Sequence, residues 1–112
     1  MKSIFFFIET PLMERDYIRF GFEKLNRLGF EAHAFDFSRL LHPNIERYYP
    51  ESKPVHYPNH HFIESESEYL SLLNRYGQKS VALMYFGNRL DTKFIYSALA
   101  ARGIWYGLTF LG

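Results

Sequence analysis

An apolar run of five residues, Ile4 to Ile8, constrains the fold of this 112-residue chain more than any other feature of the sequence. A strand with one face in water alternates apolar and polar residues, whereas a strand covered on both faces is apolar throughout. A second run, Val81 to Phe86, has the same character. The two segments therefore predict central strands of a parallel sheet with helices on both faces.

Three of the predicted helices each end at a glycine, the residue that most readily takes the positive φ found after many helix ends. Their apolar residues recur at intervals of three and four positions, as on one face of a helix. The segments and their glycines are 18–28 with Gly29, 65–76 with Gly77, and 89–102 with Gly103.

Two of these helices have characteristic first residues. Ser65 and Glu68 fit a capping box, in which the serine side chain accepts a backbone N–H and the later glutamate reaches back. Asn88 is expected to cap the helix that starts at Arg89, with Asp91 in its first turn beside the positive end of the helix dipole.

The other strands are less regular. Residues 31–37 alternate in character and predict a second strand, and residues 104–111 predict the last one. Four of the five prolines lie within residues 38–61, and a proline removes a hydrogen-bond donor from a strand. The elements expected in this stretch are a short helix within 38–48 and a third strand at either 55–57 or 61–63.

Strands that alternate with helices predict βαβ units with right-handed crossovers, and hence an open sheet in the strand order 3-2-1-4-5. We expect residues 1–112 to form one α/β domain of the Rossmann-like or flavodoxin-like class. The final helix that would cover the sheet beside the first helix is lacking, and exposed apolar surface costs about 25 cal/mol per Å². We therefore expect either the amino-terminal half of a longer two-domain protein or a subunit that self-associates through the uncovered sheet face.

Composition excludes several classes of protein. The chain has no cysteine, so it forms neither a disulfide nor a cysteine-ligated zinc site. Its formal net charge of +1 is far from the basic stripe of a nucleic-acid-binding protein. The first apolar run is too short to span a bilayer and makes a poor signal peptide, so a cytoplasmic location is expected. The 20% aromatic content predicts a core filled with rings or, alternatively, a surface that stacks on sugars or contacts proteins.

A ligand-binding crevice is expected between the first strand and the strand at 81–86, where the strand order reverses. The loops 9–16 and 86–89 should meet there. The candidate ligand-binding residues are Glu9, Thr10, Arg15, Asp16, Gly87, Asn88 and Arg89. The alternative is a structural role, in which Thr10 shapes a turn, the acids favour a helix N-terminus and the arginines are solvated.

Neither a cofactor nor a metal is predicted. Asp36 takes the place of a ribose-binding acid, but the glycine fingerprint of dinucleotide-binding folds is missing after the first strand. That loop also lacks the Ser, Thr and Gly residues expected of an FMN site. The histidines show no metal-binding spacing and are expected mainly in surface loops, while an acid–base role of His60 or His61 stays open. The five histidines are His33, His42, His56, His60 and His61.

Three stretches of the chain resemble the amino-terminal domain of bacterial surface-carbohydrate glycosyltransferase-like proteins. The stretches are IETP (8–11), ERDYIRFGFEKLNRLGFEAHAFDFS (14–38) and ALAARGIWYGLTFLG (98–112). They share a helix ending in Leu-Gly-Phe, a strand ending in Asp, and a later helix end followed by Gly-Ile and a strand. Such proteins consist of two Rossmann-like domains, the GT-B architecture.

In that architecture the amino-terminal domain holds the sugar acceptor and the carboxy-terminal domain binds the nucleotide-sugar donor. The resemblance implies that Glu9, Arg15 and Asp16 lie on the acceptor side, faced by Asn88 and Arg89. It also makes Glu9 or Asp16 a candidate for the base that takes the acceptor proton. Without its donor-binding half, the chain is expected to be inactive alone. The competing interpretation is a non-enzymatic Rossmann-like module that binds a ligand or a protein.

Overall fold

The computed structural model describes residues 2–48 and 57–109, which form an open five-stranded sheet. Every pair of neighbouring strands is parallel, and the order is β3-β2-β1-β4-β5. The strands are β1 (Ser3–Ile8), β2 (Glu31–Asp36), β3 (His60–Phe62), β4 (Ser80–Met84) and β5 (Trp105–Leu108). The predicted α/β class and strand order are confirmed.

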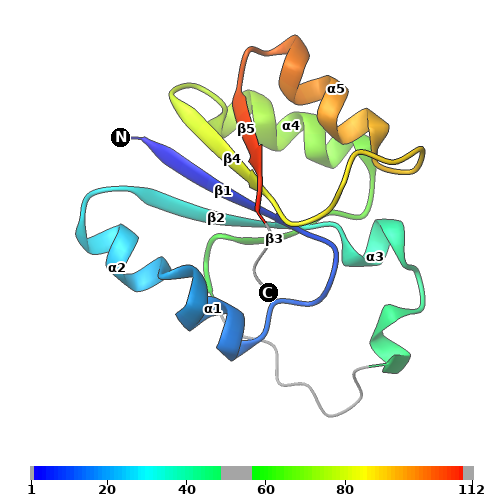
Figure 1. The fold of residues 1–112 in the computed structure, drawn as a ribbon, viewed down its shortest axis with the longest axis horizontal. Coiled ribbons are helices and arrows are strands. Elements are labelled where there is room, and N and C mark those ends of the chain that lie inside the picture. Colours follow the sequence, from blue (N-terminus) through cyan, green and yellow to red (C-terminus); the bar gives the residue numbers. More distant parts are fainter. Residues whose placement is uncertain (1, 49–56, 110–112) are drawn as a thin grey trace.

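Helices cover both faces of the sheet (Figure 1). One face carries α1 (Glu14–Phe20) and α2 (Phe22–Arg27), and the other carries α4 (Glu66–Tyr76) and α5 (Lys93–Ala101). The short helix α3 (Ser38–Leu41) and a 3-10 helix (Ile45–Tyr48) follow β2. Among the described residues, no helix combines the length and the apolar character needed to cross a membrane.

Strand β1 supplies both hydrophobic cores because successive side chains of a strand point to opposite faces. Phe5 and Phe7 are fully buried beneath α4 and α5, and both stack on Phe35 of β2, with ring centroids 4.6 and 4.9 Å apart. Phe6 and Ile8 are buried on the side of α1 and α2. Half of the twelve largest fully buried side chains are aromatic, so many of the rings in the sequence lie in the core.

The helix predicted over residues 18–28 is interrupted at Gly21, which has a φ of +72°. The chain changes direction there, and the two halves do not share one apolar face. Ile18 and Leu28, predicted on that face, are 69% and 64% exposed, while Phe22 is fully buried. The prediction of one continuous helix was wrong because a left-handed glycine shifts the phase of all later residues.

The proline-rich stretch folds in shorter pieces than predicted. The expected helix over 38–48 is divided into α3 and the 3-10 helix, which lie on either side of Pro43. Strand β3 begins one residue before the later of the two predicted positions, and residues 55 and 56 of the earlier one lie outside the described part of the chain. Three residues suffice to pair β3 with β2.

The predicted helix ends at Gly29, Gly77 and Gly103 are confirmed within a residue or two. At the start of α4, the Ser65 hydroxyl accepts the backbone N–H of Glu68, at 3.2 Å. The Glu68 carboxylate accepts the N–H of residue 64 rather than that of Ser65, so only half of the predicted capping box forms.

One edge of the sheet is incompletely covered. Val81 and Trp105 are paired between β4 and β5 and point to the face of α1 and α2, where they are 36% and 61% exposed. Tyr106 and Leu108, on the other face of β5, are 39% and 50% exposed. We call Val81 and Trp105, which share the face of α1 and α2, the β5 patch. The predicted uncovered sheet surface is therefore present.

Candidate functional site

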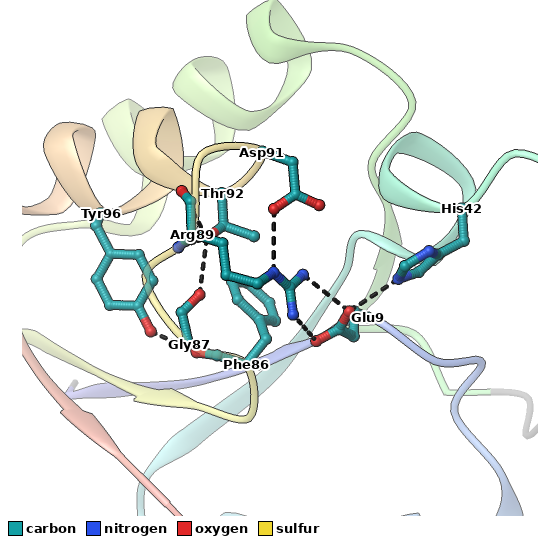
Figure 2. Close-up of polar contacts among 8 residues, drawn as sticks. All are labelled: Glu9, His42, Phe86, Gly87, Arg89, Asp91, Thr92 and Tyr96. Carbon is teal, nitrogen blue, oxygen red and sulfur yellow. Dashed lines mark hydrogen bonds and ion pairs between the residues drawn. The ribbon is translucent and has the colours of Figure 1, made fainter.

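The loops after β1 and β4 meet at the point where the strand order reverses (Figure 2). Glu9 follows β1 directly, and Arg89 lies in the loop between β4 and α5. The Arg89 guanidinium donates two hydrogen bonds to the Glu9 carboxylate, Nη1 to Oε2 at 3.2 Å and Nη2 to Oε1 at 3.0 Å. Two of the predicted site residues are thus joined in a bidentate ion pair.

Arg89 also bonds to a second carboxylate. Its Nε donates to Asp91 Oδ1 at 3.0 Å, so the guanidinium lies between Glu9 and Asp91 (Figure 2). The side chains of Arg89 and Asp91 are about half exposed, at 43% and 52%, while that of Glu9 is only 19% exposed. The least exposed charge of the group is therefore the carboxylate that follows the central strand.

His42 completes the cluster. Its Nε2 lies 2.8 Å from Glu9 Oε1, and its ring is 41% exposed. This residue comes from the end of α3, and the sequence had predicted no role for it in the crevice. The signal that could have indicated it is the position of α3, which follows a strand adjacent to β1 and so reaches the same edge of the sheet. We call Glu9, His42 and Arg89 the switch-point cluster.

Thr92 fixes the loop that presents Arg89. The fully buried Thr92 hydroxyl accepts the backbone N–H of Arg89 at 2.8 Å and donates to the carbonyl of Gly87 at 2.7 Å. The Tyr96 hydroxyl donates to the carbonyl of Phe86 in the same loop. Together these bonds hold residues 86–92 in a compact turn before α5.

The start of α5 differs from the prediction. The helix begins at Lys93 with Thr92 as its N-cap residue, not at Arg89 with Asn88 as the cap. Asp91 consequently precedes the helix and pairs with Arg89 instead of lying in the first helical turn. Asn88 is exposed, and no side-chain hydrogen bond of Asn88 exists among the described residues.

The charges of the cluster shift the acidity of its members. Burial acts to raise the pKa of Glu9, but the hydrogen bonds and charges of Arg89 and His42 outweigh it and lower that pKa below its ordinary value. Hydrogen bonds to Glu9 and Asp91 raise the pKa of Arg89. Glu9 is therefore ionised at neutral pH. A carboxylate with a lowered pKa is a weak base, so Glu9 suits binding and orientation better than proton removal.

Two other predicted residues of the first loop, Thr10 and Asp16, line a hollow of about 290 Å³, whereas Arg15 does not. The residues that line it are Ile8, Glu9, Thr10, Asp16, Arg19, Phe20 and Tyr85. We call it the β1–α1 hollow. Glu9 belongs both to this hollow and to the switch-point cluster, so the two form one continuous candidate site.

Asp16 is the most buried charged group of the hollow, with a side chain 11% exposed. Its carboxylate accepts the backbone N–H of Met13 at 3.2 Å and a hydrogen bond from Arg19 Nη2 at 3.0 Å. Arg15 is 80% exposed and lies 4.0 Å from the same carboxylate. The structural alternative, an acid at a helix N-terminus with solvated arginine beside it, thus describes Asp16 and Arg15 well.

Gly87 was predicted to allow a close backbone approach. An added Cβ would meet no atom within 4 Å, and Gly87 does not take a left-handed φ. Nothing in the described part of the chain therefore requires glycine at this position. Close approach of a ligand to the backbone would be a separate reason for a glycine at position 87.

Asp36 and the histidines of β2 and β3 lie away from the crevice. Asp36 is fully buried and accepts hydrogen bonds from the N–H of Ser38 at 2.9 Å and from His60 Nε2 at 2.8 Å. Asp36 therefore connects α3 with β3, and its carboxylate is not open to a ribose. The expectation of surface histidines was wrong for His33, which is fully buried, and for His60, whose side chain is 4% exposed. His56 lies outside the described residues.

A pair of histidines, His33 and His61, connects β2 with β3. His33 lies between Glu31, at 2.6 Å from its Nε2, and His61, at 2.8 Å from its Nδ1. Within residues 2–48 and 57–109, no three histidine, aspartate or glutamate side chains are placed to hold a metal ion together. The His33–His61 pair is therefore a structural contact across the sheet.

A larger hollow of about 420 Å³ lies at the opposite end of the sheet, near Gly77, Lys79 and Arg102. It is close to the amino end of β4, whereas open parallel sheets bind their ligands at the carboxyl ends of the strands. We therefore regard the smaller β1–α1 hollow and the switch-point cluster as the candidate site.

The chain matches no protein-family model, and comparisons with curated proteins and with solved structures also find no similar protein. The class defined by fold and site is accordingly a Rossmann-like α/β domain with a charged cluster at its switch point. The resemblance to glycosyltransferase-like proteins stays a prediction.

Proposed function

We propose that this chain is the acceptor-side amino-terminal domain of a glycosyltransferase in cell-surface carbohydrate biosynthesis. The observation that carries the proposal is the cluster of Glu9, His42 and Arg89 at the switch point of the sheet. Ligands of this fold class bind at that place, and the three side chains offer donors and acceptors to sugar hydroxyl groups. The resemblance of the sequence to two-domain transferases supplies the substrate class.

In this proposal His42 is the base. An ionised Glu9 accepts the Nε2–H of His42, which leaves the lone pair on Nδ1, and Nδ1 has no partner among the described residues. An imidazole nitrogen with an available lone pair is the side-chain group that most often serves as a general base. Glu9 orients the ring, and Arg89 holds Glu9 in place. Asp16, the other predicted base, already accepts two hydrogen bonds.

The reaction would need the donor-binding domain. The acceptor oxygen forms its bond to the anomeric carbon of the donor sugar as the bond to the nucleotide phosphate breaks, and His42 receives the hydroxyl proton. The carboxy-terminal domain of such enzymes binds the donor, so the 112-residue chain alone is expected to transfer no sugar. A cytoplasmic location is part of the proposal.

Amide NMR of the ¹⁵N-labelled chain tests the acceptor role. Methyl β-D-glucopyranoside and its galacto and manno isomers should shift amides of residues 9–10, 42 and 87–92, while UDP-glucose and GDP-mannose should bind no more tightly than these sugars. Glu9→Gln should weaken sugar binding because Gln cannot hold Arg89 and His42 as an ion pair does. Glu23→Gln is the matched control, since Glu23 is exposed and has no partner among the described residues.

Two results would overturn the proposal. One is the absence of any sugar-induced shift in the switch-point cluster, and the other is tighter binding of the nucleotide sugars at that site. Sugar transfer by the 112-residue chain, measured as release of the nucleoside diphosphate, would overturn only the expected inactivity.

A second candidate function is a non-enzymatic interaction module. The β5 patch favours it, since apolar sheet surface is left exposed on an edge strand without a charged or proline residue. In that case the switch-point cluster would serve mainly to join the loops.

A further inference from the structure

The β1–α1 hollow has the size of a site for one small ring. Its volume is about 290 Å³, at the lower end of the roughly 300–1,000 Å³ found for ligand pockets. A nucleotide sugar has three rings and a diphosphate, most of which would remain outside such a space. A single sugar ring would be largely enclosed.

One wall of the hollow is aromatic. Phe20 and Tyr85 line it with ring centroids 4.7 Å apart, and both side chains are only partly buried. Phe20 stacks on Phe6 beneath it, with centroids 4.9 Å apart and planes inclined by 10°, so its position is set by the core. The face of an aromatic ring carries partial negative charge and attracts the polarised C–H groups of a pyranose.

Other lining residues are polar, and one of them, Arg19, lies over the Phe20 ring with its guanidinium carbon 5.5 Å from the ring centroid. The Asp16 carboxylate is fixed by the N–H of Met13 and by Arg19, whose guanidinium is 44% exposed. Arg19 uses one nitrogen in this bond, and a guanidinium has five N–H donors. Neighbouring hydroxyls of a sugar, each a donor and an acceptor, can therefore bond to both side chains at once.

The charges of the hollow are balanced. Asp16 is paired with Arg19, and Glu9 is paired with Arg89 just outside the hollow. Because no cation among the described residues that line the hollow lacks a carboxylate partner, the hollow has little attraction for a phosphate or a carboxylate ligand. An uncharged, hydroxyl-rich ring is the chemistry that fits.

We propose that the β1–α1 hollow binds one neutral hexopyranose ring, with its C–H face on Tyr85 and its hydroxyls on Asp16 and Arg19. The inference rests on the proposed acceptor role and deepens it by naming the subsite and the substrate class. Glu9, which lines both the hollow and the switch-point cluster, then links the bound ring to His42.

Saturation-transfer NMR with methyl β-D-glucopyranoside and methyl β-D-galactopyranoside tests the subsite, with affinities from amide titrations. Tyr85→Leu keeps an apolar side chain but removes the ring, and it should raise Kd about tenfold, as expected for the loss of one stacking contact. Tyr48→Leu is the matched control because Tyr48 is 80% exposed and far along the chain from the hollow. Arg19→Gln, which changes an exposed side chain, provides a second variant should Tyr85→Leu fail to fold.

The outcomes separate the subsite from the proposed function. Sugar-induced shifts at Glu9 and His42 with unchanged affinity in both Tyr85→Leu and Arg19→Gln would overturn the subsite and leave the acceptor role standing. Shifts in the hollow that are lost in these variants but unaffected by Glu9→Gln would support the subsite and weigh against the catalytic cluster. Tighter binding of glucose 6-phosphate or glucuronate than of the neutral glycosides would overturn the assignment to an uncharged ring.

Discussion

His33 and His61 form a pair of hydrogen-bonded imidazoles whose two rings lie on β2 and β3, with Tyr76 of α4 packed against both. Burial lowers the pKa of His33, despite the opposing influence of Glu31. Burial, together with the charges of His33, His60 and Arg75, lowers the pKa of His61 from 6.5 to about 4. Both rings are therefore neutral at pH 7 in the folded chain.

This pair should make the fold sensitive to acid. Above pH 6.5 His61 is neutral in both states and contributes no pH dependence. Between pH 6.5 and about 4, His61 is protonated in the unfolded chain but stays neutral in the folded chain. The free energy of unfolding therefore decreases as the pH is lowered through this range. The loss is at most about 3.5 kcal/mol, from a pKa difference of about 2.5 units at about 1.4 kcal/mol each.

Urea unfolding of the wild type and of His61→Gln at pH 7, 5.5 and 4.5 checks this prediction. The variant lacks the titrating ring at position 61, so its free energy of unfolding should fall less steeply than that of the wild type. If the free energy of unfolding decreased equally with falling pH in the wild type and in His61→Gln, the assignment of the lowered pKa to His61 would be contradicted.

The switch-point cluster was predictable only in part. Glu9 and Arg89 could be placed together from the sequence because each follows a central strand, and parallel strands end at the same edge. Their direct ion pair could not be foreseen, since the sequence does not fix side-chain direction in a loop. His42 was missed because it follows a helix of four residues in a proline-rich stretch that has no clear periodicity.

At the scale of an element, the turn before α5 depends on Thr92. Replacing it with alanine removes the acceptor for the N–H of Arg89 and the donor to Gly87. We expect Thr92→Ala to cost about 1–2 kcal/mol of stability, because the N–H of Arg89 and the carbonyl of Gly87 each lose a hydrogen-bond partner. Amide hydrogen exchange of residues 87–92 should become faster.

Thr92→Ser keeps the hydroxyl and should remain close to the wild type in urea unfolding. Thr10→Ala changes an exposed threonine and should have little effect. If Thr92→Ser were as unstable as Thr92→Ala, the lost methyl group and not the hydroxyl would explain the change.

The break between α1 and α2 gives another element-scale prediction. Gly21 takes a φ of +72°, so Gly21→Ala is strained although an added Cβ would meet no atom within 4 Å. A left-handed conformation costs a non-glycine residue about 1 kcal/mol or more. Gly87→Ala, with equal space and no left-handed φ, should be nearly neutral in the same thermal or urea unfolding experiment. A similar loss for both variants would contradict the conformational explanation.

The presence of the helices was easier to predict than the residues at which they start or break, and these errors have a common cause. Gly21 and Thr92 both redirect the chain through local backbone geometry that leaves the apolar spacing almost unchanged. Apolar spacing reports which residues can share a face, but it does not fix where the first helical turn begins. Helix α5 begins after Thr92, although the Thr92 side chain makes no hydrogen bond to the helix and bonds back to Arg89 and Gly87 instead.

At the scale of the whole molecule, the topology followed from the sequence because the runs Ile4–Ile8 and Val81–Phe86 are apolar on both faces. Only central strands of a covered sheet tolerate such runs, and right-handed crossovers then leave few strand orders. Which apolar residues of the sheet stay exposed, notably Trp105 at 61%, depends on strand register and required the structure.

The β5 patch should make the 112-residue chain associate or bind apolar dyes. Trp105 is the only tryptophan, so its fluorescence reports directly on the patch. In dilute solution its emission should be long in wavelength and easily quenched by iodide, because the ring is in water. As the protein concentration rises, the emission should shift to shorter wavelength while the mass measured by light scattering increases, since a partner copy then covers the ring.

Val81→Lys places a charge in the β5 patch while keeping Trp105 as the reporter. It should abolish the concentration-dependent shift and lower the binding of anilinonaphthalene sulfonate, because burying an unpaired ammonium is costly. Lys93→Gln, on the exposed surface of α5, is a control that should leave both readouts unchanged. A wild-type chain that stays monomeric at all concentrations, with no dye binding, would mean that this exposed surface is tolerated in water and needs no partner.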